Sequence, residues 1–242
     1  MNLIIDIGNS LIKTAVFNQN EILEKNSFLN KEFSNNLILI LKKYNIDHTI
    51  LSSVGKLSKN QIKVVQDLFT PLVLSITTKL PFVNKYETPE TLGVDRIALV
   101  AAAVNKFPGK NVLIIDAGSC VTFDFVNFNK EYYGGAISPG IEMRYKAIHT
   151  FTANLPELSR SDTIPEIGNT TKNAIHLGVE NGIIQEIEGV IHQYKAKYSK
   201  LTIVLTGGDT IFLAKNIKST IFANPNFLLE GLNSILIYNI DE

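Results

Sequence analysis

A pattern of strand, aspartate and glycine occurs twice in this chain. Residues 3–10 read Leu-Ile-Ile-Asp-Ile-Gly-Asn-Ser, and residues 113–120 read Leu-Ile-Ile-Asp-Ala-Gly-Ser-Cys. In each copy an apolar run predicts a buried strand, an aspartate ends it, and a glycine turns the chain into a second β-rich run. A carboxylate lies beside each turn, and the glycine in the turn has no side chain, so a phosphate or its cation has room to approach backbone N–H groups. We therefore predict two copies of one phosphate-handling hairpin, which can face each other across a cleft.

The spacing of the two copies divides the 242 residues into halves of similar size. We predict an α/β protein of two domains, residues 1–109 and residues 110–242. In the first domain the hairpin continues as an antiparallel meander, and the expected elements are strands at 21–28, 49–53 and 72–76 and helices at 31–44, 59–68 and 96–106. In the second, the expected elements are strands at 121–128, 132–137 and 201–206 and helices at 140–151, 171–198 and 227–238.

The composition is that of an ordinary globular protein. Basic and acidic residues number 23 each, so the net charge is zero and argues against a nonspecific grip on nucleic acid. The single cysteine, Cys120, excludes an intramolecular disulfide and is compatible with a reducing compartment. The N-terminus enters a strand at once and no long apolar run follows, so we expect a cytoplasmic protein without a membrane anchor. None of the four histidines has an acidic or cysteine partner at ligand spacing, and we interpret them as structural or surface residues.

Several residues have both a chemical and a structural interpretation. Asp6 and Asp116 are either ligands of hard cations or residues that favour the turns in which they lie. Lys13 either neutralises a transferred phosphate or is an ordinary exposed lysine on a strand. Asp95 precedes an alanine-rich helix, where it is either a catalytic carboxylate or an N-cap. A third glycine turn, Thr-Gly-Gly-Asp at residues 206–209, lets the backbone pass close to a flat ligand such as adenine, or simply joins a strand to a helix.

The order of two Asp-Gly hairpins followed by Thr-Gly-Gly-Asp resembles the actin-like ATPase and sugar kinase superfamily. There the three motifs are called phosphate 1, phosphate 2 and adenosine. The resemblance covers the whole chain. It implies duplicated actin-like (ribonuclease H-like) domains, each a mixed sheet with helices, and an ATP cleft between them.

More specific motifs resemble the type III pantothenate kinase family. They are Leu-Gly-Val-Asp-Arg at 92–96, Gly-Gly-Ala-Ile-Ser-Pro-Gly at 134–140, and Gly-Asn-Thr-Thr at 168–171 with Gly178 and Gly182 after it. This family transfers the γ-phosphate of ATP to the primary hydroxyl of pantothenate and forms 4'-phosphopantothenate, the first step of coenzyme A biosynthesis. The resemblance implies ATP with Mg²⁺ and a monovalent cation, K⁺ or NH₄⁺.

The same resemblance implies a role for each matching residue. Asp95 is the general base, Asp116 binds the monovalent cation, and Ser119 is an ATP contact. The remaining ATP contacts are Asp6, Ile7, Gly8, Asn9, Ser10, Leu11, Ile12 and Lys13. The pantothenate contacts are Tyr86, Gly93, Val94, Asp95, Arg96 and Thr171. Without the resemblance, Tyr86 would be an ordinary partly buried aromatic and Thr171 a helix cap. Where the family usually carries threonine, this chain has Ser10 and Ser119, which keep the hydroxyl but lack the methyl group.

By resemblance we also expect a homodimer whose partner completes the pantothenate pocket. Two alternatives stay open. One is a different kinase of the superfamily, acting on a sugar or another small alcohol through the same hairpins. The other is a noncatalytic ATP-binding regulator, against which the intact set of Asp6, Asp95 and Asp116 argues.

Overall fold

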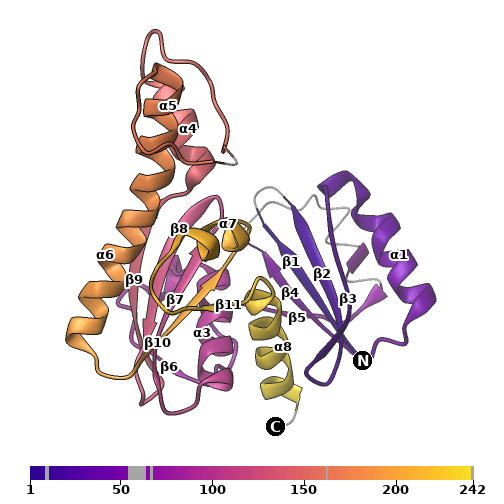
Figure 1. Ribbon diagram of the computed structural model, residues 1–242. Helices are drawn as coiled ribbons and strands as arrows, with labels where there is room; N and C mark the ends of the chain where they lie inside the picture. Colours follow the sequence, from indigo (N-terminus) through magenta and orange to yellow (C-terminus); the bar gives the residue numbers. More distant parts are fainter. Residues whose placement is uncertain (9–10, 54–63, 66–67, 162, 241–242) are drawn as a thin grey trace. The chain divides into compact units, whose positions relative to one another are not determined.

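The protein is described by a computed structural model covering residues 1–8, 11–53, 64–65, 68–161 and 163–240. The chain forms two compact units, each built of a sheet and helices (Figure 1). Unit 1 comprises Met1–Pro108, Lys130–Tyr133 and Asn226–Glu242, and unit 2 comprises Gly109–Asn129 and Gly134–Pro225. The predicted α/β class is confirmed.

The sheet of unit 1 has the strand order β3-β2-β1-β4-β5. Its strands are β1 (Asn2–Ile7), β2 (Ile12–Asn18), β3 (Glu21–Phe28), β4 (His48–Ser53) and β5 (Leu72–Val73). The first three strands pair antiparallel, which confirms the predicted meander, and β4 adds parallel to β1. Every residue of β1 is buried, as an apolar strand between two neighbours should be. Because β1 and β4 run in parallel, both end at the edge where Asp6 lies.

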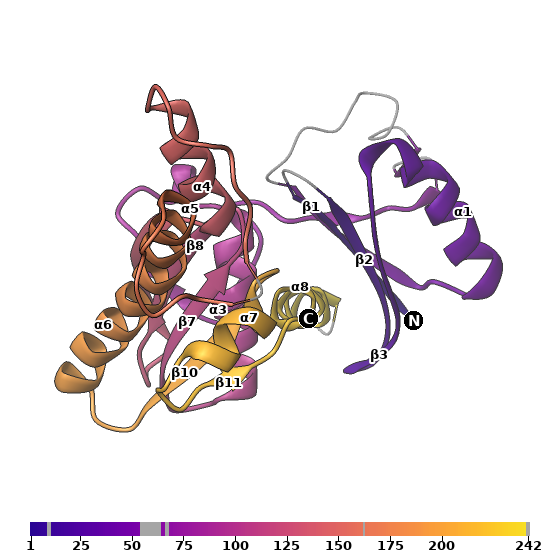
Figure 2. The same cartoon turned by 45° about the horizontal axis from the view of Figure 1, so that its top comes forward.

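The helices of unit 1 bury their apolar stripes. In α1 (Phe33–Lys43), which follows the 3₁₀ turn η1 (Asn30–Glu32), the buried residues Phe33, Leu37 and Ile40 recur at helical spacing and join the core of the meander. Figure 2 shows α1 beside the sheet of unit 1. The terminal helix α8 (Phe227–Ile240) packs on α3 (Val94–Lys106). A Cβ on Gly231 would lie 1.9 Å from the carbonyl oxygen of Ala98, so glycine permits this close approach. The helix predicted at 59–68 falls largely outside the described residues.

A second sheet has the order β11-β10-β7-β8-β9-β6. Its strands are β6 (Val83–Asn84), β7 (Asn111–Ala117), β8 (Cys120–Val126), β9 (Glu131–Pro139), β10 (Leu201–Thr206) and β11 (Phe222–Ala223). Strands β7 and β8 form the second antiparallel hairpin, and β10 lies parallel to β7. The hairpin that the repeated sequence predicts is therefore present again. A short 3₁₀ turn, η2 (Pro89–Thr91), precedes α3.

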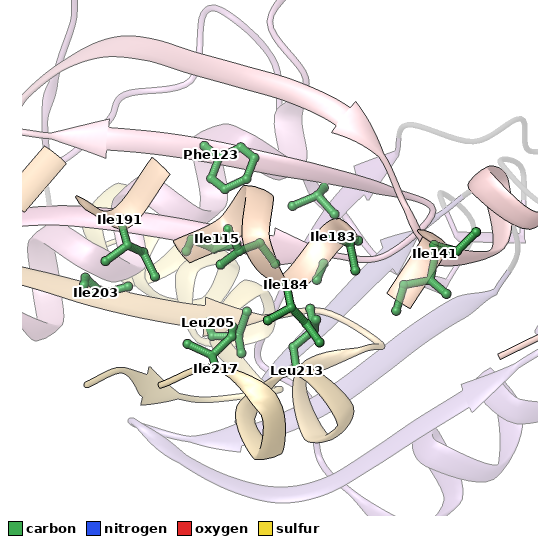
Figure 3. Packing of buried hydrophobic residues seen from close by; sticks show 14 of the residues in the cluster. Ile115, Phe123, Ile141, Ile183, Ile184, Ile191, Ile203, Leu205, Leu213 and Ile217 are labelled. Carbon is green, nitrogen blue, oxygen red and sulfur yellow. The ribbon is translucent and has the colours of Figure 1, made fainter. Parts of the chain in front are cut away.

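The core of unit 2 lies between this sheet and its helices, which are α4 (Ile141–Thr150), α5 (Thr171–His176), α6 (Gly182–Lys197) and α7 (Thr210–Asn216). Figure 3 shows isoleucines of α6 beside Ile115 and Phe123 of the hairpin and Leu205 of β10. A π-helical turn, η3 (Leu177–Asn181), joins α5 to α6, so the helix predicted at 171–198 contains an irregularity that apolar spacing did not reveal. Within the described ranges, no helix has both the length and the apolar character that a membrane span needs.

Candidate active site

Asp6 lies at the carboxyl end of β1, between charged and polar neighbours. Lys13 is its partner on the antiparallel strand β2, and Ser52 is its partner on the parallel strand β4. The side chain of Asp6 is 3% exposed, and its Oδ1 accepts no hydrogen bond from any described residue. A buried carboxylate oxygen without a donor is costly, and this position therefore suits a ligand that supplies positive charge.

The electrostatics of Asp6 link three predicted site residues in unit 1. Burial raises the pKa of Asp6 to about 6, Lys13 opposes this shift, and the negative charge of Asp95 adds to it. The proton affinity of Asp6 thus depends on Asp95, although 89 residues of sequence separate them. Asp6 and Lys13 of the first hairpin and Asp95 of a separate motif are therefore close enough for Lys13 and Asp95 both to act on Asp6.

Asp95 lies in the first turn of α3 and is not the N-cap. Gly93 holds the cap position, and Asp95 Oδ1 accepts the backbone N–H of Arg96 at 2.8 Å. A Cβ on Gly93 would lie 2.3 Å from that oxygen, so the missing side chain gives the carboxylate its position. Negative charge in the first turn is also favoured by the helix dipole. The N-cap alternative is wrong for Asp95, and its half-buried carboxylate needs another explanation.

Arg96 is buried and held against a column of aromatic rings in unit 1. Its guanidinium carbon lies 5.5 Å from the centre of the Tyr86 ring. Tyr86 stacks on Tyr132 at 6.2 Å with an angle of 9° between the rings, and Tyr132 meets Phe82 edge-on. An aromatic face holds a guanidinium in a fixed orientation, and the planar fork of a guanidinium matches a carboxylate or another polar end of a small molecule.

The second hairpin places Asp116 among hydroxyl groups. Its register partners are Thr122 on β8 and Thr206 on β10. Gly207 follows Thr206 with φ at +96°, and a Cβ there would lie 2.5 Å from Asp116 Oδ1 and 2.2 Å from the carbonyl oxygen of Ala117. The Thr-Gly-Gly-Asp turn therefore lies against the second hairpin, and glycine keeps open the space beside the Asp116 carboxylate.

Ser119 lies exposed in the turn of the second hairpin, under the glycine-rich stretch 134–140. The backbone N–H of Gly140 donates to the carbonyl oxygen of Ser119 at 3.2 Å. A Cβ on Gly140 would lie 2.2 Å from the carbonyl oxygen of Gly118, so this contact excludes a side chain. The stretch is therefore more than a connection between strand and helix, because it fixes the turn that carries Ser119.

Thr171 is the exposed first residue of α5, and the cap of that helix is its neighbour. Thr170 Oγ1 accepts the backbone N–H of Asn173 at 3.1 Å, so the cap alternative is wrong for Thr171.

Other predicted ATP contacts differ in what they can offer. Ile7 and Ile12 are paired in register and bury their side chains in the core, which leaves only their backbone for a ligand. Gly8 closes the turn by donating to the carbonyl oxygen of Leu11, whose side chain is exposed. Val94 opens α3. Asn9 and Ser10 lie outside the described residues.

Sequence reasoning missed two polar groups. The first is Ser52, which lies beside Asp6 on β4. The predicted strand at 49–53 was a signal for it, because neighbouring parallel strands end at the same edge of a sheet. The second group is a buried cluster in unit 2, in which Tyr145 OH lies 2.7 Å from His176 Nδ1 and donates to Glu180 Oε1 at 2.6 Å. His176 has an acidic neighbour that the sequence analysis did not single out, since Glu180 follows at i+4, and its burial agrees with the interpretation of a structural histidine.

Comparisons with known proteins agree with these motifs. The family model described as type III pantothenate kinase matches residues 2–193. A type III pantothenate kinase of Christiangramia forsetii is 52% identical over 240 residues, covering 99% of each chain, and one of Flavobacterium psychrophilum is 48% identical, covering 98% of this chain and 99% of the relative.

Among solved structures, a glucokinase from an Antarctic psychrotroph aligns with a TM-score of 0.54 at 13% identity, covering 98% of each chain. At this identity the likeness concerns the fold alone. It confirms the predicted actin-like and sugar kinase fold class.

Proposed function

This chain belongs to the type III pantothenate kinase family, and we propose that Asp95 is the general base of its reaction. The protein is a kinase that phosphorylates pantothenate in coenzyme A biosynthesis. The observation that carries the assignment is the position of Asp95 in the first turn of α3, uncommitted to capping and electrostatically linked to Asp6. Family membership gives the reaction, and this geometry supports the residue.

The chemical demand on Asp95 is modest. Phosphoryl transfer passes through a loose transition state, so little negative charge develops on the attacking hydroxyl before the bond forms. The base must orient that hydroxyl in line with the γ-phosphate and accept its proton late. A carboxylate held by the Arg96 backbone N–H and fitted against Gly93 meets this demand, because both contacts restrict its rotation.

Unit 1 also supplies phosphate contacts in this proposal. Lys13 neutralises a transferred phosphate as a point charge, and Gly8, which has no side chain, leaves room for the phosphate to approach. The orphaned Oδ1 of Asp6 fits Mg²⁺, either as a ligand or through bound water. Mg²⁺ bound to ATP would neutralise charge that develops on the phosphate oxygens. The other proposed ATP contacts are Ile7, Asn9, Ser10, Leu11, Ile12 and Ser119.

The monovalent cation is proposed to bind at Asp116. Its support is the set of neutral oxygens around a carboxylate: Thr122 and Thr206 stand in register on both sides. Glycine at 207 keeps the space beside Oδ1 unfilled. Potassium and ammonium are large, weakly hydrated ions that suit such a site better than sodium does.

The proposed pantothenate contacts are Tyr86, Gly93, Val94, Arg96 and Thr171, together with the base Asp95. Pantothenate carries a carboxylate at one end and the reacting hydroxyl at the other. The guanidinium of Arg96, braced by Tyr86, fits the charged end. The exposed Thr171 offers a hydroxyl for the polar middle of the molecule.

We propose that the enzyme works as a cytoplasmic homodimer. Support comes from large apolar side chains of unit 2 that are exposed in the single chain, namely Ile137, Met143, Phe151 and Ile167. A contiguous exposed apolar surface is typical of an interface, and these four side chains come from one region of the sequence, residues 137–167. Analytical ultracentrifugation at assay concentrations checks this: a dimer is expected, and a monomer would contradict it.

The test of the function is ATP-dependent formation of phosphopantothenate by the purified protein with Mg²⁺, first in potassium and then in sodium. We expect product, with more in potassium. Asp95→Asn should lower turnover by about 10²- to 10³-fold and leave ATP affinity within about twofold. Glu90→Gln, an exposed carboxylate five residues earlier, is the matched control and should behave as wild type. Wild-type turnover in Asp95→Asn would exclude Asp95 as the base.

A further inference from the structure

Residues 151–170 connect α4 to α5 without forming a helix or strand in their described part (Figure 1). Connections of this length are uncommon in compact domains, and those that occur are usually functional. The segment ends at Thr170, which caps α5, and at Thr171, the proposed pantothenate contact. The contacts that hold this segment therefore contribute to the position of Thr171.

The segment is fastened through Glu180. The backbone N–H of Ser161 donates to Glu180 Oε1 at 2.6 Å, and the hydroxyl of Tyr145 donates to the same oxygen at 2.6 Å. Glu180 is fully buried and lies on η3, the π-helical turn after α5. One carboxylate thus joins α4, the middle of the connecting segment and the helix that carries Thr171.

A stabilising role alone does not account for this carboxylate. Glu180 Oε2 is buried and accepts no hydrogen bond from any described residue, and an apolar side chain of similar volume would avoid that desolvation cost. The π-helical turn adds a second local cost, and such turns occur frequently at functional sites because they redirect a side chain. Burial raises the pKa of the Tyr145 hydroxyl, which keeps it a neutral donor.

We propose that Glu180 is a positioning residue for pantothenate. It fixes Ser161 to the end of η3 and so holds the connecting segment that leads into Thr171, which places Thr171 for substrate binding. This inference rests on the proposed contact of Thr171 with pantothenate. It concerns binding of that substrate, whereas the assignment of Asp95 concerns turnover, so the two can fail separately.

The chain offers a matched control for Glu180. Glu188, on the next helix α6, also holds a connecting segment: it accepts the backbone N–H groups of Lys218 and Ser219 and the hydroxyl of Ser219. That segment follows α7 and carries none of the proposed contacts. Loss of Glu188 should therefore release a connecting segment without reaching Thr171.

The experiment compares Glu180→Met, Glu180→Gln and Glu188→Met for steady-state kinetics and for pantothenate binding by calorimetry. Methionine removes the acceptor but keeps the volume, whereas glutamine keeps an acceptor oxygen. We expect Glu180→Met to raise the KM and Kd for pantothenate about tenfold, with kcat and the KM for ATP within about twofold of wild type. Glu180→Gln should restore most of the affinity, and Glu188→Met should match wild type.

A double-mutant cycle tests the route through Thr171. If Glu180 acts by placing Thr171, Thr171→Val and Glu180→Met should each weaken pantothenate binding, and together no more than the stronger of the two. Additive losses, or a wild-type Kd in folded Glu180→Met, would overturn the proposal. If Glu180→Met does not fold, Tyr145→Phe removes one donor and keeps the ring. A pantothenate Kd unchanged in that variant would also overturn it.

Discussion

The two aspartate hairpins share a backbone pattern but differ in what faces the carboxylate. In unit 1, Asp6 is 3% exposed and stands opposite a positive charge, Lys13. In unit 2, Asp116 is half-buried and stands between Thr122 and Thr206, which carry hydroxyls. The repeated sequence thus predicts the shape of each hairpin, whereas the residues at cross-strand positions decide its electrostatics.

This difference indicates a division of labour. The first hairpin carries its own counter-charge and a carboxylate of raised pKa, and it suits phosphates and the divalent ion that accompanies them. The second hairpin places a carboxylate beside two threonines, and such a set of oxygens suits a monovalent cation from solution. A comparison of matched substitutions in the two hairpins tests this reading directly.

The largest effect should come from Asp6→Asn set against Asp116→Asn. We expect Asp6→Asn to lower turnover by about 10²- to 10³-fold in either salt, because it removes a fixed charge at the phosphates. Asp116→Asn should lower turnover only to the level that wild type shows in sodium, because it removes the site of potassium stimulation. Phosphopantothenate formation in potassium and in sodium measures both. If Asp116→Asn were still stimulated by potassium, the assignment of the monovalent cation to the second hairpin would be contradicted.

The second effect concerns the glycines that support the second hairpin. Gly207→Ala should destabilise the protein by about 2–4 kcal/mol, because alanine is strained at a positive φ and its Cβ would lie 2.2 Å from the carbonyl oxygen of Ala117. Gly118→Ala, within the hairpin turn itself, should change stability by less than about 1 kcal/mol, because the nearest atom to its Cβ lies at 4.0 Å. Denaturant unfolding of both variants measures the difference, and equal losses would contradict it.

Much of the fold could be predicted from the sequence because apolar periodicity reports burial. The meander, α1, β10 and the glycine turns follow from local patterns. Periodicity does not report the packing partner, and for that reason the grouping of α8 with unit 1 required the structure. Short elements such as α7 and β11 carry too few residues to show a period, and the π-helical turn looks like ordinary helix in sequence.

The third effect is a dependence of stability on pH that belongs to the first hairpin. Because burial raises the pKa of Asp6 from 3.8 to about 6, the folded state binds a proton that the unfolded state releases between these values. Stability is therefore lost as pH rises through about 6, by about 3 kcal/mol in total. Asp6→Asn should be more stable than wild type by this amount at pH 7.5 and by less at pH 5. A difference that does not grow with pH would contradict the raised pKa.

The candidate site was less predictable than the fold, for a physical reason. Motifs such as Asp-x-Gly mark where a carboxylate and a turn meet, and these are local features. The link between Asp6 and Asp95 and the fastening of Ser161 by Glu180 depend on elements far apart in sequence. The glycine at position 93 indicates in the sequence that a side chain is not tolerated there, but only the structure shows that the Asp95 carboxylate occupies that space.

The smallest effect isolates the cross-strand lysine. Lys13→Met removes the positive charge opposite Asp6 while keeping the length of the side chain, so we expect the KM for ATP to rise about tenfold, the value of one charge contact of about 1.4 kcal/mol. Since Lys13 lowers the pKa of Asp6, its loss should also move the acid limb of the pH–rate profile to higher pH. Lys25→Met, on the neighbouring strand and bonded only to Asn226 among the contacts described for its ammonium, is the control. If Lys13→Met left both the KM and the acid limb unchanged, the counter-charge that distinguishes the first hairpin from the second would have no role in catalysis.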